Sequence, residues 1–115
     1  MKNDQGDKVI SLAPFEVNDF EKEAIVYEAI GSKIRLAILY LMKKYGETYT
    51  RSLIPALNLS QPTVTSHLNK LYRAGIIKKR EQEKFTFYSI NEEFCYVLDG
   101  VFKNINKMEK LKETA

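Results

Sequence analysis

The 115-residue sequence contains one cysteine, one histidine and no tryptophan, so it has few of the side chains that build metal sites and nucleophilic centres. One Cys and one His cannot supply the N and S ligands that a transition-metal site normally uses. Cys95 has no partner for an internal disulfide, which fits a reducing compartment. The sequence has no Gly-rich phosphate loop and no nucleophile with a plausible base, and His67 is its only histidine. We therefore expect no metal, no cofactor and no enzymatic activity.

Long hydrophobic runs are also missing. No stretch approaches the ~20 apolar residues that a membrane-spanning helix needs, and residues 1–8 are polar rather than a basic segment before an apolar run. We expect a cytoplasmic protein that does not enter the membrane. Because a chain of this length buries one modest core, we expect a flexible arm over residues 1–13 and a single domain over residues 14–115.

Positive charge is concentrated in the middle of the chain. The net charge is −4 over residues 1–30, +4 over residues 31–57, +4 over residues 58–90 and −1 over residues 91–115. This distribution is what one face turned toward a polyanion would give. A solvated surface without a polyanionic partner gives the same pattern, so the charge alone leaves both interpretations open.

Hydrophobic residues recur at helical spacing through the first two thirds of the chain and predict four helices. These helices are expected at residues 20–30, 32–45, 50–57 and 60–74. Ser32 and Ser60 have hydroxyl groups suited to cap the free amides of a helix start. A glycine follows the first, second and fourth helices, where a residue without a Cβ commonly ends a helix. A proline in a helix interior costs ~3 kcal/mol, so Pro55 predicts that the third helix starts later than Thr50 or is distorted.

The last third of the chain changes to a period of two and then returns to a helical period. Residues 76–80 and 85–90 are typical of the two strands of a β-hairpin, joined by the polar stretch 81–84. Asn91 is suited to cap a last helix, expected over residues 91–112, whose hydrophobic residues form a heptad seam. The predicted fold is α+β and mainly α, with four helices, a β-hairpin and a long C-terminal helix.

The helix predicted over residues 60–74 has one apolar and one polar side. Val64, Leu68 and Leu71 share the side that is expected to face the core. The opposite side is uncharged at its start and basic toward its end: it carries Pro62, Ser66, Asn69 and Arg73, and Thr65 and Lys70 lie between the two sides. Short polar side chains reach base edges in the major groove, and cations neutralise phosphates. This helix is therefore predicted to read DNA, the alternative being an ordinary amphipathic helix.

The predicted hairpin places basic residues on a projecting element beside that helix. These residues are Lys78, Lys79, Arg80 and Lys84. Such a wing can contact the DNA backbone next to the groove. Glu81 and Glu83 would be repelled by phosphates, so the tip is expected to point away from the DNA or to stand over the edge of the minor groove.

Three segments resemble the ArsR (ArsR/SmtB) family of winged-helix repressors, and the resemblance extends over residues 25–105. The segments are Gly-Ser-Lys-Ile-Arg-Leu-Ala-Ile-Leu at 31–39, Leu-Ser-Gln-Pro-Thr-Val-Thr-Ser-His-Leu at 59–68 with Leu71, Ala74, Gly75 and Ile76, and Arg80 with Phe-Tyr-Ser-Ile at 87–90. The resemblance implies a winged helix-turn-helix fold, a homodimer formed by the first and last helices, a palindromic operator on double-stranded DNA and control of transcription.

Matching the family's contact positions implies base contacts at Gln61, Pro62, Thr65 and Ser66, with Arg80 and Lys84 in the wing. Together with the outer side of the helix, the predicted base contacts are Gln61, Pro62, Thr65, Ser66 and Asn69. The predicted backbone contacts are Ser60, Thr63, Lys70, Arg73, Lys78, Lys79, Arg80 and Lys84.

The sequence departs from the metal-sensing members of this family, which carry a Cys pair on the third helix or Asp and His ligands on the last helix. Here residues 50–54 are Thr-Arg-Ser-Leu-Ile, and the last helix has no His. A metal effector is therefore not expected, and the nature of any small-molecule effector stays open. His67 is interpreted as a structural residue at the edge of the core. Cys95 is interpreted as a small packing residue, the alternative being a redox switch through an intersubunit disulfide.

The heptad seam of the last helix has two interpretations, packing over its own domain or a dimer interface. A 115-residue chain has too little core to cover both sides of such a helix, and a two-fold operator requires a two-fold protein. The predicted dimer contacts are Phe20, Tyr27, Phe94, Val97, Leu98, Val101, Phe102, Ile105 and Met108.

Two functions fit these observations, a sequence-specific transcriptional regulator (a repressor in preference to an activator) and a winged-helix module that binds proteins. A protein-binding surface is expected to be apolar and aromatic at its centre. The predicted outer side of helix 60–74 is instead short, polar and basic. The sequence therefore favours DNA binding.

Overall fold

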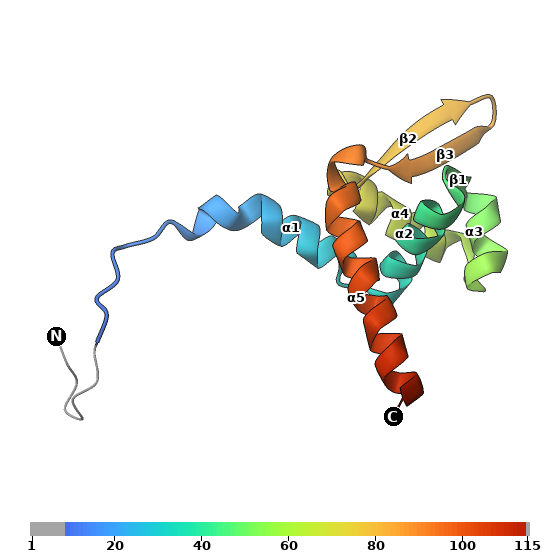
Figure 1. The fold of residues 1–115 in the computed structure, drawn as a ribbon. Helices are drawn as coiled ribbons and strands as arrows, with labels where there is room; N and C mark the ends of the chain where they lie inside the picture. Colours follow the sequence, from blue (N-terminus) through green and yellow to red (C-terminus); the bar gives the residue numbers. More distant parts are fainter. Residues whose placement is uncertain (1–8, 115) are drawn as a thin grey trace.

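The computed structural model describes the backbone of residues 9–114 and the side chains of residues 9–104. The elements of this part follow the predicted order of four helices, a hairpin and a final helix, which confirms the winged helix-turn-helix fold (Figure 1). Their bounds are η1 Val17–Phe20, α1 Glu21–Ile30, α2 Lys33–Tyr45, β1 Thr48–Tyr49, α3 Thr50–Leu57, α4 Gln61–Arg73, β2 Ile77–Gln82, β3 Phe85–Ile90, η2 Glu92–Phe94 and α5 Cys95–Thr114.

The caps of α2 and α4 are the residues that the sequence predicts. The Ser32 hydroxyl accepts a hydrogen bond from the amide of Arg35 at 3.4 Å, and the Ser60 hydroxyl accepts one from the amide of Thr63 at 3.4 Å. Both bonds satisfy amides that have no partner within the helix. The turn after α4 requires a positive φ of 79° at Gly75, a conformation that a residue without a Cβ adopts freely.

The helix α3 begins at Thr50 even though Pro55 lies inside it, so the first of the two alternatives expected for this helix, a later start, is wrong. The preceding strand β1 ends at Tyr49, which pairs with Phe87 of β3. This pairing anchors the chain immediately before α3. The sequence does not predict β1, because a strand of two residues is too short to show a period and exists only through its pairing with a distant segment.

The hairpin is longer than the sequence indicates. The strands form an antiparallel sheet in the order β1-β3-β2, and Gln82 pairs with Phe85. Glu81 and Gln82 therefore belong to β2, and only Glu83 and Lys84 form the turn. Glu83 adopts a positive φ of 56°, which two-residue hairpin turns require but which Gly, Asn or Asp usually supplies. The missing glycine signal explains why the predicted turn was too wide.

The last helix starts later than predicted. Asn91 caps the 3-10 turn η2, where its side-chain oxygen accepts a hydrogen bond from the amide of Glu93 at 3.3 Å, and α5 begins at Cys95 rather than at residue 91. The side-chain amide of Asn91 also donates to the carbonyl of Gly75 at 3.0 Å. This bond ties the start of the last helix to the turn that follows α4.

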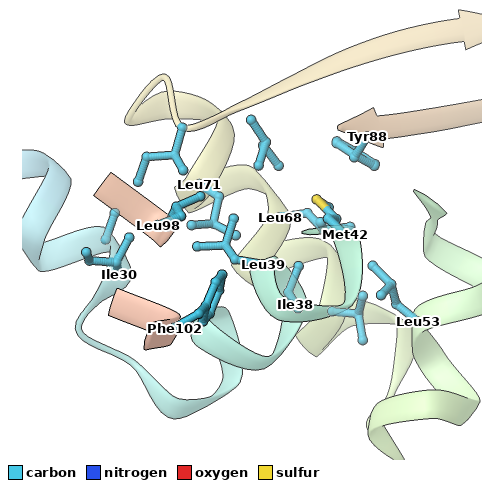
Figure 2. Close-up of a cluster of buried hydrophobic side chains, with 14 residues drawn as sticks. Ile30, Ile38, Leu39, Met42, Leu53, Leu68, Leu71, Tyr88, Leu98 and Phe102 are labelled. Atoms are coloured by element: carbon cyan, nitrogen blue, oxygen red, sulfur yellow. The ribbon is translucent and has the colours of Figure 1, made fainter. Parts of the chain in front are cut away.

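The core lies between the C-terminal end of α1, α2, α3, α4, the base of the hairpin and α5 (Figure 2). Val64, Leu68 and Leu71 of α4 are 0% exposed, so the predicted core side of this helix is confirmed. Burying each such side chain contributes roughly 1.5–3 kcal/mol. The helix α4 is therefore held firmly by one side, and its opposite side faces solvent.

The helix α1 extends away from this core (Figure 1). Of its ten residues, only Ala29 and Ile30 at its C-terminal end are buried. Phe20 before the helix and Ile25 and Tyr27 within it are exposed. Among the described residues, no helix is both long enough and apolar enough to cross a membrane.

Candidate nucleic-acid interface

The solvent side of α4 forms an open groove of about 520 Å³, here called the reading groove. Its lining residues are Gln61, Pro62, Thr65, Ser66, Asn69, Lys70 and Arg73. The structure therefore brings together all five predicted base contacts and two of the predicted backbone contacts. The uncharged residues Gln61, Pro62, Thr65 and Ser66 lie in the first turns of α4, Asn69 lies further along it, and Lys70 and Arg73 lie in its last turn.

The N-terminal end of α4 is favourable for an anion. Its first turn contains no acidic residue, and its unpaired amides carry the positive end of the helix dipole. Ser60 and Thr63, both predicted backbone contacts, hydrogen bond to each other through their hydroxyl groups at 2.8 Å. These two side chains thus order the helix start, where Gln61 and Pro62 begin the reading groove.

A second groove, of about 350 Å³, lies between α4 and the hairpin and is here called the wing groove. Its lining residues are Tyr49, Thr50, Arg51, Gln61, Thr65, Lys84, Phe85, Thr86 and Tyr88. Gln61 and Thr65 line both grooves, so a continuous polar surface extends from α4 to the wing. Arg51 was not among the predicted contacts, because only the pairing of β1 with β3 brings the start of α3 next to the hairpin.

Arg80 of the wing is held by an acidic residue of its own chain. Its Nε and Nη2 donate to the two carboxylate oxygens of Glu47 at 3.1 and 2.6 Å, and its Nη1 donates to Oε1 of Gln82 at 2.6 Å. The guanidinium also lies 4.6 Å from the centre of the Phe87 ring. The hydrogen bonds between Arg80 and Glu47 lower the pKa of the Glu47 carboxyl and raise the pKa of the Arg80 guanidinium. Arg80 therefore joins the wing to the loop before β1, in addition to any contact with DNA.

Two other wing residues also have partners within the chain. The Lys79 Nζ lies 4.5 Å from the centre of the Tyr72 ring, which ties β2 to the end of α4. The Lys78 Nζ lies 3.8 Å from a carboxylate oxygen of Glu92. Lys84 lies at the hairpin turn and lines the wing groove. Of the predicted wing contacts, Lys84 thus shares a groove with the predicted base contacts Gln61 and Thr65.

Replacing Glu47 by glutamine should release Arg80 for a phosphate. We expect tighter binding to non-specific DNA, and a plot of log affinity against log salt that is steeper by about one phosphate contact. The fold should be little affected, because exposed ion pairs contribute ~0–1 kcal/mol.

The control for this change is Glu81→Gln in β2, which removes the same charge without touching Arg80. Titrations of a fluorescent duplex at several salt concentrations give both slopes. Equal slopes for the two variants would show that Arg80 does not exchange Glu47 for DNA.

The predicted dimer residues fall into two groups. Leu98 and Phe102 are 1% and 5% exposed and belong to the core of their own chain. Phe102 packs edge-on against Tyr40 of α2, and Lys43 of α2 forms an ion pair with Asp99. These two residues of the seam are therefore not free for a partner, because they are buried in the core of their own chain.

The other group is accessible. A groove of about 230 Å³ between α1 and α5, the α1–α5 groove, is lined by Lys22, Glu23, Val26, Tyr27, Phe94, Tyr96 and Val97. Tyr96, which was not predicted, is 77% exposed. Val101 is half-buried and packs against the core, and Phe20 is exposed. The side chains of Ile105 and Met108 lie outside the described residues.

The Cys95 side chain is exposed, so the expected packing contact is not formed within its own chain. Among the side chains that the structure describes, no three His, Cys, Asp or Glu residues come together as a group that could hold a metal ion.

Comparison with known proteins agrees with this architecture. The family described as "Bacterial regulatory protein, arsR family" matches residues 32–79. The HTH-type transcriptional regulator MJ1325 of Methanocaldococcus jannaschii is 36% identical over 89 residues, which are 77% of this chain and 92% of that protein. The crystal structure of the transcriptional repressor PagR of Bacillus anthracis superposes with a TM-score of 0.64 at 28% identity, covering 78% of this chain and 99% of that one.

The fold is also shared with the homodimeric winged helix-turn-helix DNA-binding domain of Mb0332 from Mycobacterium bovis. That solution structure superposes with a TM-score of 0.73 at 20% identity, covering 84% of this chain and 92% of that one. These findings confirm the family that the sequence resembles and the expectation that the protein is a regulator and not an enzyme. The chain belongs to the ArsR family of winged helix-turn-helix transcriptional regulators.

Proposed function

We propose that this regulator binds a palindromic site on double-stranded DNA as a homodimer and represses transcription there. The observation that carries the proposal is the continuity of the reading groove with the wing groove through Gln61 and Thr65. An α-helix fits the major groove with its N-terminal residues against base edges, while an adjoining wing follows the backbone. PagR, a relative with a similar structure, is named a transcriptional repressor, which supports repression over activation.

The side chains divide into two roles. Gln61, Thr65 and Ser66 lie in the first turns of α4 and are short enough to hydrogen bond to bases. The basic residues Lys70 and Arg73 lie in its last turn and carry affinity through phosphates. Arg51 and Lys84 line the wing groove and extend the phosphate contacts.

The second subunit is proposed to cover the α1–α5 groove. Phe20, Tyr27 and Tyr96 are 55%, 62% and 77% exposed, and α1 buries only two of its own residues. An exposed apolar surface of this kind marks a site of association with another protein. In a two-fold dimer the same surface of a second copy covers it. The described homodimer of Mb0332 supports this arrangement.

The alternative function, a winged-helix module that binds proteins, is less well supported. Protein interfaces are depleted of charge at their centre and enriched in aromatic side chains. The reading groove has no aromatic residue in its lining and ends in two cations. A protein partner would therefore find few apolar anchors on this side of α4.

Replacing Gln61 by alanine should cost about 1–3 kcal/mol of binding free energy at the selected site and relax sequence preference at particular base pairs. The site is first obtained by selection from random duplexes with the full-length protein. We expect a palindrome with two chains bound per duplex. Binding is then measured for each single base change.

Asn18→Ala in η1 is the matched control, because it removes an exposed amide outside both grooves. It should bind with the preference of the wild type. Failure to select any sequence would overturn the proposed function. A wild-type preference in Gln61→Ala would place the base contacts elsewhere on the protein.

A further inference from the structure

Arg35 is a buried charge with a defined set of acceptors. It is 8% exposed and lies in the first turn of α2. Its Nε donates to the carbonyl of Ala29 at 2.5 Å, and its Nη2 donates to the carbonyl of Glu28 at 3.4 Å. Both carbonyls belong to the last turn of α1, whose carbonyl groups have no amide partners further along the helix. Arg35 thus caps α1 with a positive charge, which the helix dipole favours at a C-terminal end.

The same guanidinium also reaches α4. Its Nη1 lies 3.1 Å from the Nδ1 of His67. A guanidinium only donates hydrogen bonds, so Nδ1 must accept, and the proton of the neutral imidazole must be on Nε2. Burial, followed by the positive charges of Arg35 and Lys70, lowers the pKa of His67. The neutral form that this contact needs is therefore the form present at neutral pH.

The surroundings contain more positive than negative groups. A hollow of about 190 Å³ beside Arg35 lies between α1 and α4 and is lined by Glu28, Lys70 and Arg73 among others. Glu28 is the acidic residue of this lining, and it comes from α1, whereas Lys70 and Arg73 come from α4. A proton on His67 would both remove the acceptor for Arg35 and add a third positive charge on this side of α4.

We propose that Arg35 and His67 form a positioning pair that fixes the orientation of α4 relative to α1. This inference rests on the proposed function, in which α1 contacts the second subunit and α4 enters the major groove. One side chain then connects the dimer element to the reading helix. The pair sets the separation of the two reading helices, and with it the half-site spacing that the dimer accepts.

The test compares three variants at position 67 on two duplexes. His67→Leu removes the acceptor, His67→Asn places an amide oxygen where Nδ1 lies, and His67→Gln places it near the position of Nε2 instead. One duplex carries the selected palindrome with its own spacing. The other, the shifted duplex, has one base pair inserted between the half-sites, which separates them by a further ~3.4 Å. A duplex with one half-site reports binding without a spacing requirement.

We expect the wild type and His67→Asn to bind the correctly spaced palindrome more tightly than the shifted one. His67→Leu and His67→Gln should lose about tenfold on the correct spacing, the equivalent of one lost hydrogen bond to a charged group, and should discriminate less between the two duplexes. Binding to the single half-site should be the same for all. Circular dichroism verifies folding, and if His67→Leu does not fold, the Asn and Gln variants carry the comparison.

Acidification provides an independent readout. The folded-state pKa of His67 lies below its ordinary value of 6.5, so the unfolded chain takes up its proton first and the folded form loses stability relative to it as the pH falls below 6.5. In the folded protein the imidazole stays neutral to a lower pH, and the pair is lost as the pH falls through that lowered pKa. The spacing preference of the wild type should fade over that range, while that of His67→Asn should persist. If His67→Leu keeps the wild-type spacing preference, or if asparagine does not rescue it, the inference is overturned. A wild type that binds no palindrome overturns the proposed function and the inference together.

Discussion

Raising the salt concentration from 50 to 200 mM should weaken binding of the dimer to its site by about three to five orders of magnitude. Each subunit presents Arg51, Lys70, Arg73 and Lys84 along its two grooves. A dimer would then make on the order of six to ten phosphate contacts, and each contact releases counterions from the DNA. The slope of log affinity against log salt should be about −0.9 per contact.

Variants inside and outside the two grooves show which positive charges determine the salt dependence of binding. The double variant with Lys70→Ala and Arg73→Ala should flatten the slope by about two contacts per subunit and weaken all sequences similarly. Lys103→Ala removes an exposed charge on α5, outside both grooves, and should leave the slope unchanged. A wild-type affinity that hardly changes with salt would contradict a polyanionic partner for this surface.

Replacing Tyr27 by glutamate should raise the dissociation constant of the dimer at least about 100-fold. An unpaired carboxylate buried in an interface costs about 3–5 kcal/mol, and two-fold symmetry places the substitution in the interface twice. Tyr27 is 62% exposed in the single chain, so its substitution should leave the fold of that chain intact. Sedimentation at micromolar concentration measures the change, and affinity for the palindrome should fall with it.

Tyr45→Glu is the matched control for the dimer. Tyr45 ends α2, is 68% exposed and does not line the α1–α5 groove. This variant should sediment as the wild type does. If Tyr27→Glu also sediments as the wild type, or if the wild type is a monomer at micromolar concentration, the proposed interface is wrong.

The parts of the fold that depend on neighbouring residues could be predicted from the sequence. Ser32 and Ser60 start helices through bonds that extend only three residues along the chain. The apolar period places Val64, Leu68 and Leu71 on one side of α4 without knowledge of the rest of the fold. The reading groove followed from the same period, because its lining is the other side of that helix.

The parts that depend on distant residues could not be predicted. Glu47 and Arg80 are 33 residues apart, and Arg35 and His67 are 32 apart, so no period connects them. The two-residue strand β1 exists only through its pairing with β3. In α5, Leu98 of the heptad seam is buried in the core of its own chain. A heptad pattern does not distinguish such contacts within one chain from contacts with a second chain.

The exposure of α1 has a consequence for how the regulator responds to its own abundance. An isolated helix of ten residues is marginal in water, and this one buries only Ala29 and Ile30 within its chain. In the proposed dimer, the cost of ordering α1 offsets part of the association free energy. The dimer then dissociates more readily than its contact area alone would indicate. Occupancy of the operator by such a dimer rises with the square of the subunit concentration at low abundance. A modest change in synthesis or degradation would then produce a disproportionate change in transcription.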